Sequence, residues 1–100
     1  MIELSAEERE ALELGMEYQK WAKSKPCLKI MEELDRLVLE ALREREDTLE
    51  NITAFPEICL KAGIRYIERR NFRDAVKKHV SDVIGNAIEL AKQIEQESKT

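Results

Sequence analysis

The last thirty residues carry the clearest hydrophobic pattern of the chain. Apolar side chains recur there at spacings of four and three, with no proline between them: Val76, Val80, Val83, Ala87, Leu90 and Ile94. This spacing places them along one stripe of an α-helix and is typical of helices that pack lengthwise against other helices. We therefore expect a long helix over about Phe72–Gln96, with residues 97–100 frayed at its end.

Two further amphipathic helices are predicted upstream. Ser5 and Glu8 form a capping-box pattern that starts a helix near Ala6, and this helix ends before the turn that contains Pro26. A proline suits the first turn of a second helix, which the apolar spacing extends to about Glu46. We expect these two helices to form a tight antiparallel hairpin.

The stretch around Pro56 allows two interpretations, because proline disrupts the interior of a helix. Either a short helix precedes Pro56, or one helix kinks there. Apolar residues point almost all round the helix over Ile58–Ile67, which predicts a short third helix that is buried in the bundle or shared with another subunit. Gly63 would mark a close crossing point there. Asn71 and Asp74 resemble a cap that starts the last helix.

The composition supports the same fold class. Of 100 residues, 38% are charged and only three are Gly and two Pro, which favours helices over strands. We expect an all-α antiparallel bundle in a single domain over residues 1–100, built from the hairpin, the short third helix and the long fourth helix. No apolar run approaches the roughly 20 residues of a membrane span, and the acidic N-terminus is unlike a signal peptide, so we expect a cytoplasmic protein.

Catalytic signatures are absent from the pattern. Cys27 and Cys59 are too far apart for a paired redox motif, and with a single histidine the chain offers no zinc pattern. Both lie on apolar faces, which predicts two reduced, buried thiols. His79, Asp82 and Asn86 share one edge of the last helix and could bind a metal or phosphate, but we interpret them as the polar edge of the core. We predict no enzymatic activity and no cofactor.

One family resemblance is carried by the stretches YQKWA, MEEL and HVSDVI at residues 18–22, 31–34 and 79–84. In pattern and order they are similar to the MazG-type all-α nucleotide pyrophosphohydrolases, which hold magnesium with a Glu-Glu-x-x-Glu helix and a later Glu-x-x-Asp. Glu33 and Asp82 match as ligands, whereas Arg36 and His79 replace two of the glutamates. Because an arginine repels a dication, the resemblance implies an inactive relative.

A second resemblance covers roughly residues 5–70. It is carried by the Ser-Ala-Glu-Glu-Arg start, the turn over Trp21–Pro26, the second helix rich in Glu and Leu, and the segment Ala62–Arg65. These features are similar to small helical proteins encoded in tailed-phage and prophage genomes. The resemblance implies an α-helical accessory or assembly protein and assigns no catalytic residues.

Six cationic residues gather near the start of the last helix: Arg65, Arg69, Arg70, Arg73, Lys77 and Lys78. Arginines there could contact phosphates, and the nearby Tyr66 and Phe72 could stack on bases, which keeps a nucleic-acid-binding accessory protein as an alternative. The net charge of −4 opposes that alternative. We expect this basic surface to attract the acidic first helix instead, within one protomer or between two.

The apolar arc of the last helix is wider than a single core requires. We therefore predict a homo-oligomer, and a function as a non-enzymatic helical interaction or assembly module. The candidate interface residues are Ile84, Ile88, Ala91, Ile58, Ile64, Leu12 and Met16.

Overall fold

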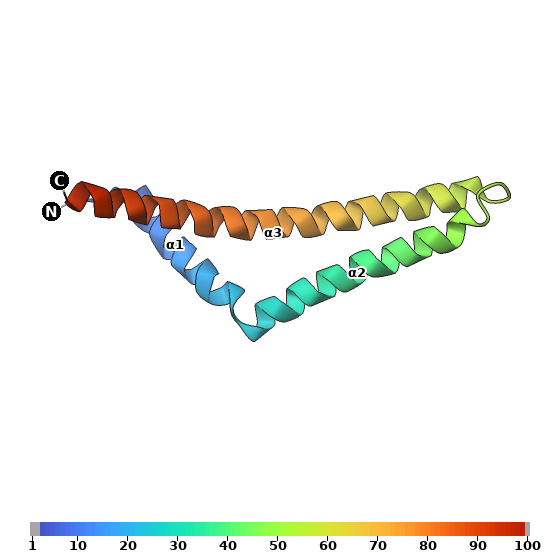
Figure 1. Cartoon of the computed structure of the whole chain (residues 1–100), viewed down its shortest axis with the longest axis horizontal. Coiled ribbons are helices and arrows are strands. Elements are labelled where there is room, and N and C mark those ends of the chain that lie inside the picture. The colour runs from blue at the N-terminus through green and yellow to red at the C-terminus, as the bar shows by residue number, and fades with distance from the viewer. Residues whose placement is uncertain (1–2, 100) are drawn as a thin grey trace. The chain divides into compact units, whose positions relative to one another are not determined.

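The structure is a computed structural model that describes residues 3–99 and contains three helices in that range (Figure 1). These are α1 (Ala6–Ala22), α2 (Lys25–Leu49) and α3 (Pro56–Ser98). No strand occurs between residues 3 and 99, which confirms the predicted all-α class. None of the described helices combines the length and the apolar character needed to cross a membrane.

The start of α1 confirms the predicted capping box. The Glu8 N–H donates to the Ser5 hydroxyl at 3.1 Å, and the Ser5 N–H donates to the Glu8 carboxylate at 3.3 Å. A second serine serves the turn between α1 and α2. The Ser24 hydroxyl donates to the Trp21 carbonyl at 2.5 Å and accepts from the Cys27 N–H at 3.3 Å, so one side chain satisfies backbone groups of both helices.

The predicted boundary at Asn71 is wrong, because α3 runs without a break from Pro56 to Ser98. No proline or glycine lies between residues 64 and 84, and one asparagine inside a helix costs only about 0.5–0.7 kcal/mol relative to alanine. The predicted third and fourth helices are therefore one helix. This helix also includes Glu97 and Ser98, which we expected to fray, whereas Thr100 lies outside the described residues.

Pro56 begins α3, and neither predicted alternative for this stretch occurs in the described residues. α2 continues to Leu49, past its predicted end near Glu46, and residues 50–55 form the connection. Pro56 is the first residue of α3, where its missing N–H costs no helical hydrogen bond.

The described residues pack as two compact units. Unit 1 combines the residues up to Cys27 with those from Lys77 onward, and unit 2 comprises Leu28–Val76. Within unit 1, α1 packs on the C-terminal part of α3, and within unit 2, α2 packs on its N-terminal part (Figure 1). The packing partner of α1 inside its unit is thus α3, whereas the sequence predicts a hairpin with the second helix.

A stripe of reduced exposure runs along α3 and repeats about every 3.5 residues, as in a coiled coil. Its members are Cys59, Ala62, Tyr66, Arg69, Arg73, Val76, Val80, Val83, Ala87, Leu90 and Ile94. The predicted stripe from Val76 to Ile94 is the second half of it. Because the stripe keeps its phase across Asn71, lengthwise packing and local hydrogen bonding both favour a continuous helix there.

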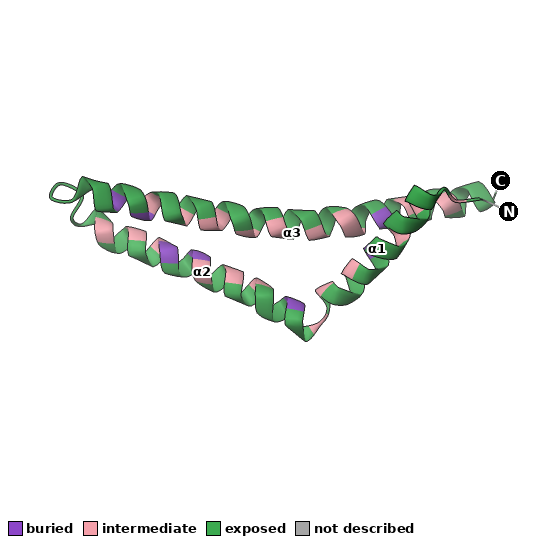
Figure 2. Ribbon diagram, turned by 180° about the vertical axis from the view of Figure 1, so that it is seen from behind, coloured by how far each residue is buried: buried purple, intermediate pink, exposed green. Residues whose placement is uncertain are grey.

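The core of both units is built from small side chains, which lie where the helices face each other (Figure 2). The buried apolar residues are Cys27, Val38, Ala41, Cys59, Ala62 and Ala87. Small residues let two helices approach closely but remove little apolar area from water. Burial of the third helix within the chain is wrong, because Ile58 and Leu60 are 54% and 65% exposed, whereas its sharing with another subunit stays a prediction.

A close helix crossing lies at Gly15 rather than at the predicted Gly63. A Cβ atom on Gly15 would overlap the Cβ of Ala87 and would lie 3.4 Å from the carbonyl oxygen of Val83. At Gly63 such a Cβ would make no overlap, because the nearest described atom of another helix is Nε of Arg45, at 3.9 Å. Contacts inside the chain therefore explain Gly15 and do not explain Gly63.

Candidate interaction surfaces

Exposed apolar side chains are concentrated in unit 2. Fifteen large apolar residues are exposed in the described part of the chain, and eleven of them belong to this unit. They are Leu28, Ile30, Leu39, Leu49, Ile52, Phe55, Ile58, Leu60, Ile64, Ile67 and Phe72. Single exposed apolar residues are common on proteins, whereas contiguous apolar patches mark interaction sites. Contiguity therefore decides whether these residues form an interaction site.

One groove joins five of them at the end of α2 and the start of α3: Leu49, Ile52, Leu60, Ile64 and Ile67. The groove has a volume of about 540 Å³, and its lining is completed by Arg45, Pro56, Cys59 and Gly63. Arg45 supplies the charge in this lining, and its guanidinium carbon lies 5.6 Å from the centre of the Tyr66 ring. That cation–π contact holds the arginine against α3. The rest of the lining is apolar.

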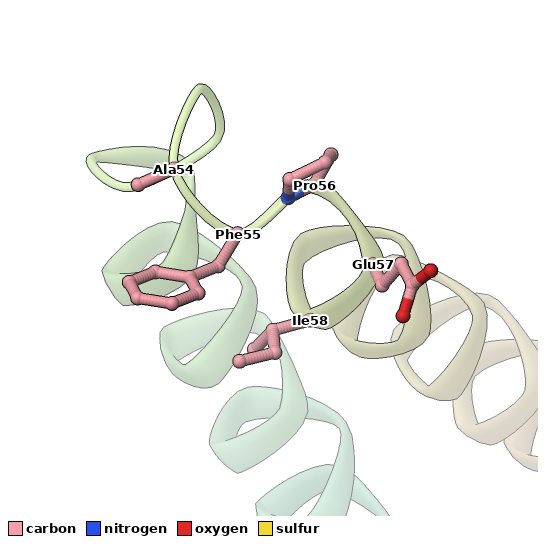
Figure 3. Close-up of a pocket in the computed structure, with 5 residues that line it drawn as sticks. All are labelled: Ala54, Phe55, Pro56, Glu57 and Ile58. Atoms are coloured by element: carbon pink, nitrogen blue, oxygen red, sulfur yellow. The ribbon is translucent and has the colours of Figure 1, made fainter.

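The turn that leads into α3 forms a smaller hollow of about 300 Å³ at the same end of unit 2 (Figure 3). The Phe55 and Ile58 side chains extend to one side of the turn, and the Glu57 carboxylate extends to the other. Phe55 is 56% exposed. The turn therefore adds apolar surface beside the groove rather than a polar binding site.

Ion pairs link α2 and α3 in unit 2. Nη1 of Arg65 lies 2.5 Å from a carboxylate oxygen of Glu44, and Nη1 of Arg73 lies 3.5 Å from one of Asp35. Nε of Arg73 also donates to Asp74 at 3.1 Å. All of these carboxylates are at least 45% exposed, so each pair contributes little to stability.

The other members of the predicted basic surface have partners as well. Arg69 donates to the Leu37 carbonyl at 3.3 Å, and the guanidinium of Arg70 lies 5.6 Å from the Tyr66 ring centre. Nζ of Lys78 lies 3.1 Å from a carboxylate oxygen of Asp82. Lys77 also interacts with another group. The cations of this surface are thus engaged along the helices rather than gathered around an open phosphate-sized site.

The four residues behind the hydrolase resemblance are all exposed. On α2, Arg36 donates to the Glu33 carboxylate through Nε at 3.0 Å, and this hydrogen bond lowers the pKa of Glu33 and raises that of Arg36. On α3, Asp82 accepts from Nζ of Lys78 at 3.1 Å. Facing solvent is the arrangement that we expect of an interaction module. Among residues 3–99 no group of three or more His, Cys, Asp or Glu side chains could hold a metal ion.

His79 contacts a residue that the sequence analysis did not connect with it. In unit 1 its Nε2 lies 3.1 Å from the Tyr18 hydroxyl, and the two rings meet edge to face with centres 5.7 Å apart. Tyr18 follows Gly15 by three residues, so both lie on the face of α1 that packs on α3. The pair is a polar contact between two helices, in line with the interpretation of His79 as an edge of the core.

Comparison with known proteins gives no family. No protein-family model, no curated protein and no solved structure matches the chain. The function is therefore inferred from the surfaces that the structure presents.

The predicted interface residues are divided between exposed and half-buried positions. Ile58, Ile64, Met16, Ile88 and Ala91 are exposed, whereas Leu12 and Ile84 are half-buried. Ile64 is one of the predicted interface residues, whereas Leu60 and Ile67, which line the same groove, are not among them. The signal was present as apolar residues at positions i, i+4 and i+7 of one helix face.

Proposed function

We propose that the protein is a non-enzymatic helical assembly module that associates with itself through its exposed apolar surface. The observation that carries this proposal is that the buried apolar side chains are small, whereas the large apolar side chains are exposed. No side chain larger than valine is buried in the described residues, whereas fifteen large apolar side chains are exposed.

The size of the core supports association on energetic grounds. Ordering a chain of this length costs conformational entropy of order 100 kcal/mol, which burial of apolar area must offset. Alanine, cysteine and valine side chains remove little apolar area from water when they are buried. A second chain that covers the leucine and isoleucine side chains would supply the burial that the two units lack.

Two measurements on the wild-type chain test the proposal. Light scattering at micromolar concentration should give a mass of two or more chains. The melting temperature should rise by a few degrees for a tenfold rise in protein concentration, because association stabilises the folded state by mass action. A monomeric mass and a concentration-independent melting temperature would contradict the proposal.

The resemblance to small tailed-phage and prophage proteins suggests a setting for such a module. An accessory or assembly role in that setting is part of the proposal. Neither the basic surface nor the exposed Glu33 and Asp82 adds an observation that favours nucleic-acid binding or nucleotide hydrolysis.

A further inference from the structure

Gly63 leaves a hollow in the wall of the groove. The structure gives no left-handed backbone at any described glycine, so Gly63 is not required by its dihedral angles. A Cβ atom there would make an ordinary contact with Nε of Arg45, at 3.9 Å. A glycine inside a helix is destabilising relative to alanine. Gly63 differs from the equally uncrowded Gly85 in that it lines the apolar groove, where exposed leucine and isoleucine side chains lie beside it.

An apolar ridge flanks this hollow. Leu60, Ile64 and Ile67 occupy positions i, i+4 and i+7 of α3 and are 65%, 45% and 44% exposed. Helices pack by placing such a ridge into the gap between ridges on a facing helix. The same surface therefore carries both the ridge and the hollow of a helix-packing interface.

We propose that the groove binds a second copy of this chain, with the two α3 helices crossing antiparallel about a two-fold axis near Gly63 and Ile64. Each Ile64 enters the hollow over Gly63 of the partner subunit, and each Leu60 packs on Ile67 of the partner subunit. The inference rests on the proposed function and specifies the surface and the geometry of self-association. A two-fold axis repeats every contact, so a ridge and a hollow on one surface satisfy both subunits.

Charges beside the ridge favour a second copy over an unrelated helix. Lys61 follows Leu60 and Glu68 follows Ile67, so both point to the same side of the ridge. Both are exposed, and neither has an ion-pair partner in the described part of the chain. When Leu60 packs on Ile67 of the partner subunit, Lys61 lies beside Glu68 of that subunit, and symmetry forms this pair twice. The chain supplies both members of each pair.

The proposed interface can extend beyond the ridge on α3. Apolar residues of the groove and of the adjacent turn at Phe55 lie at one end of unit 2, so they can be covered together.

Two glycine variants of the full-length chain form a matched test. Gly63→Leu fills the hollow, whereas Gly85→Leu adds the same side chain to α3 at a position where a Cβ would meet nothing within 4 Å. Both variants raise helix propensity, so both should keep the wild-type helical content by circular dichroism. Light scattering should show the dimer dissociation constant raised at least about 30-fold by Gly63→Leu and less than about threefold by Gly85→Leu.

A charge exchange tests the antiparallel geometry. Lys61→Glu or Glu68→Lys alone places two like-charge pairs in the dimer and should weaken association about tenfold. The double variant restores opposite charges and should return the dissociation constant to within about threefold of wild type. Single variants without effect, or a double variant as weak as the sum of the singles, would overturn the proposed crossing.

The outcomes separate this inference from the proposed function. A wild-type dimer that persists in Gly63→Leu would overturn the groove as the interface and leave self-association intact. A monomeric wild type would overturn both, and would leave the groove to a partner of different sequence.

Discussion

The two units use glycine in opposite ways. In unit 1, Gly15 allows α1 to approach α3 so closely that Ala87 fills the place of its side chain. In unit 2, a Cβ on Gly63 would make an ordinary contact of 3.9 Å with Nε of Arg45, and exposed leucine and isoleucine side chains line the groove beside it. Unit 1 carries four of the fifteen large exposed apolar residues, and unit 2 carries eleven. Most large apolar side chains of unit 1 are thus covered by contacts within the chain. Those of unit 2 are largely exposed, and we propose that a second chain covers them.

The largest change in the free energy of unfolding is expected at Gly15, where α1 and α3 cross closely. Gly15→Ala places a Cβ against Ala87 and should lower the free energy of unfolding by about 1–3 kcal/mol, because the helix backbones must separate. Gly85→Ala meets no neighbour and should instead raise it by up to about 1 kcal/mol. Urea unfolding monitored by circular dichroism measures both. Equal effects of the two substitutions would show that the crossing at Gly15 does not limit side-chain size.

A second substitution sharpens this test. In Gly15→Ala, the change Ala87→Gly removes the overlapping atom and leaves contacts of 3.4 Å to the Val83 carbonyl oxygen and 3.6 Å to the Cα of residue 87. The double variant should recover part of the lost stability, although Ala87→Gly alone costs about 1 kcal/mol. Strictly additive losses would contradict direct contact between the two positions.

The thiols report separately on the two units. Cys27 in unit 1 and Cys59 in unit 2 are free and buried, at 2% and 9% exposure. Both should react with a thiol reagent at least about tenfold more slowly than in the urea-unfolded chain. Because Cys59 lines the groove, its labelling should slow further as protein concentration rises, whereas that of Cys27 should not change. Fast labelling of Cys27 in the native state would show that the core of unit 1 is open.

The ion pair between Arg65 and Glu44 should have a smaller effect. Both side chains are about half exposed, so a double-mutant cycle with Arg65→Gln and Glu44→Gln should give a coupling energy of about 0.2–1 kcal/mol. The coupling should fall as salt is raised, because exposed charges are screened. A coupling that does not depend on salt would indicate that packing of the arginine stem is responsible.

The features predicted correctly from the sequence are those set by neighbouring residues. The capping box at Ser5 needs only the residue three positions later, and the buried stripe from Val76 to Ile94 needs only one helix face. The burial of Cys27 and Cys59 follows from the same periodicity.

The features that the sequence did not predict depend on which faces meet. Asn71 and Asp74 resemble a weak helix cap, but the stripe of reduced exposure along α3 continues on both sides of them. The helix therefore runs through Asn71 without a break. Periodicity marks an apolar face of α1 but does not say which helix covers it, and within unit 1 that helix is α3. It also does not distinguish Gly15 from Gly63, because only the position of a second helix decides which glycine marks a crossing.

The smallest expected effect concerns the exposed face of α2. The hydrogen bond from Arg36 lowers the pKa of Glu33 below its ordinary value of 4.5. A carboxylate with a lowered folded-state pKa adds stability above its unfolded pKa and loses it as the pH falls through the folded value. Glu33→Gln should therefore reduce stability slightly at about pH 7 and have no effect at about pH 2. The control Glu32→Gln removes a carboxylate that has no partner in the described residues, and should leave stability unchanged at both. A loss in Glu33→Gln that persists at low pH would assign the effect to the side chain's packing rather than to its charge.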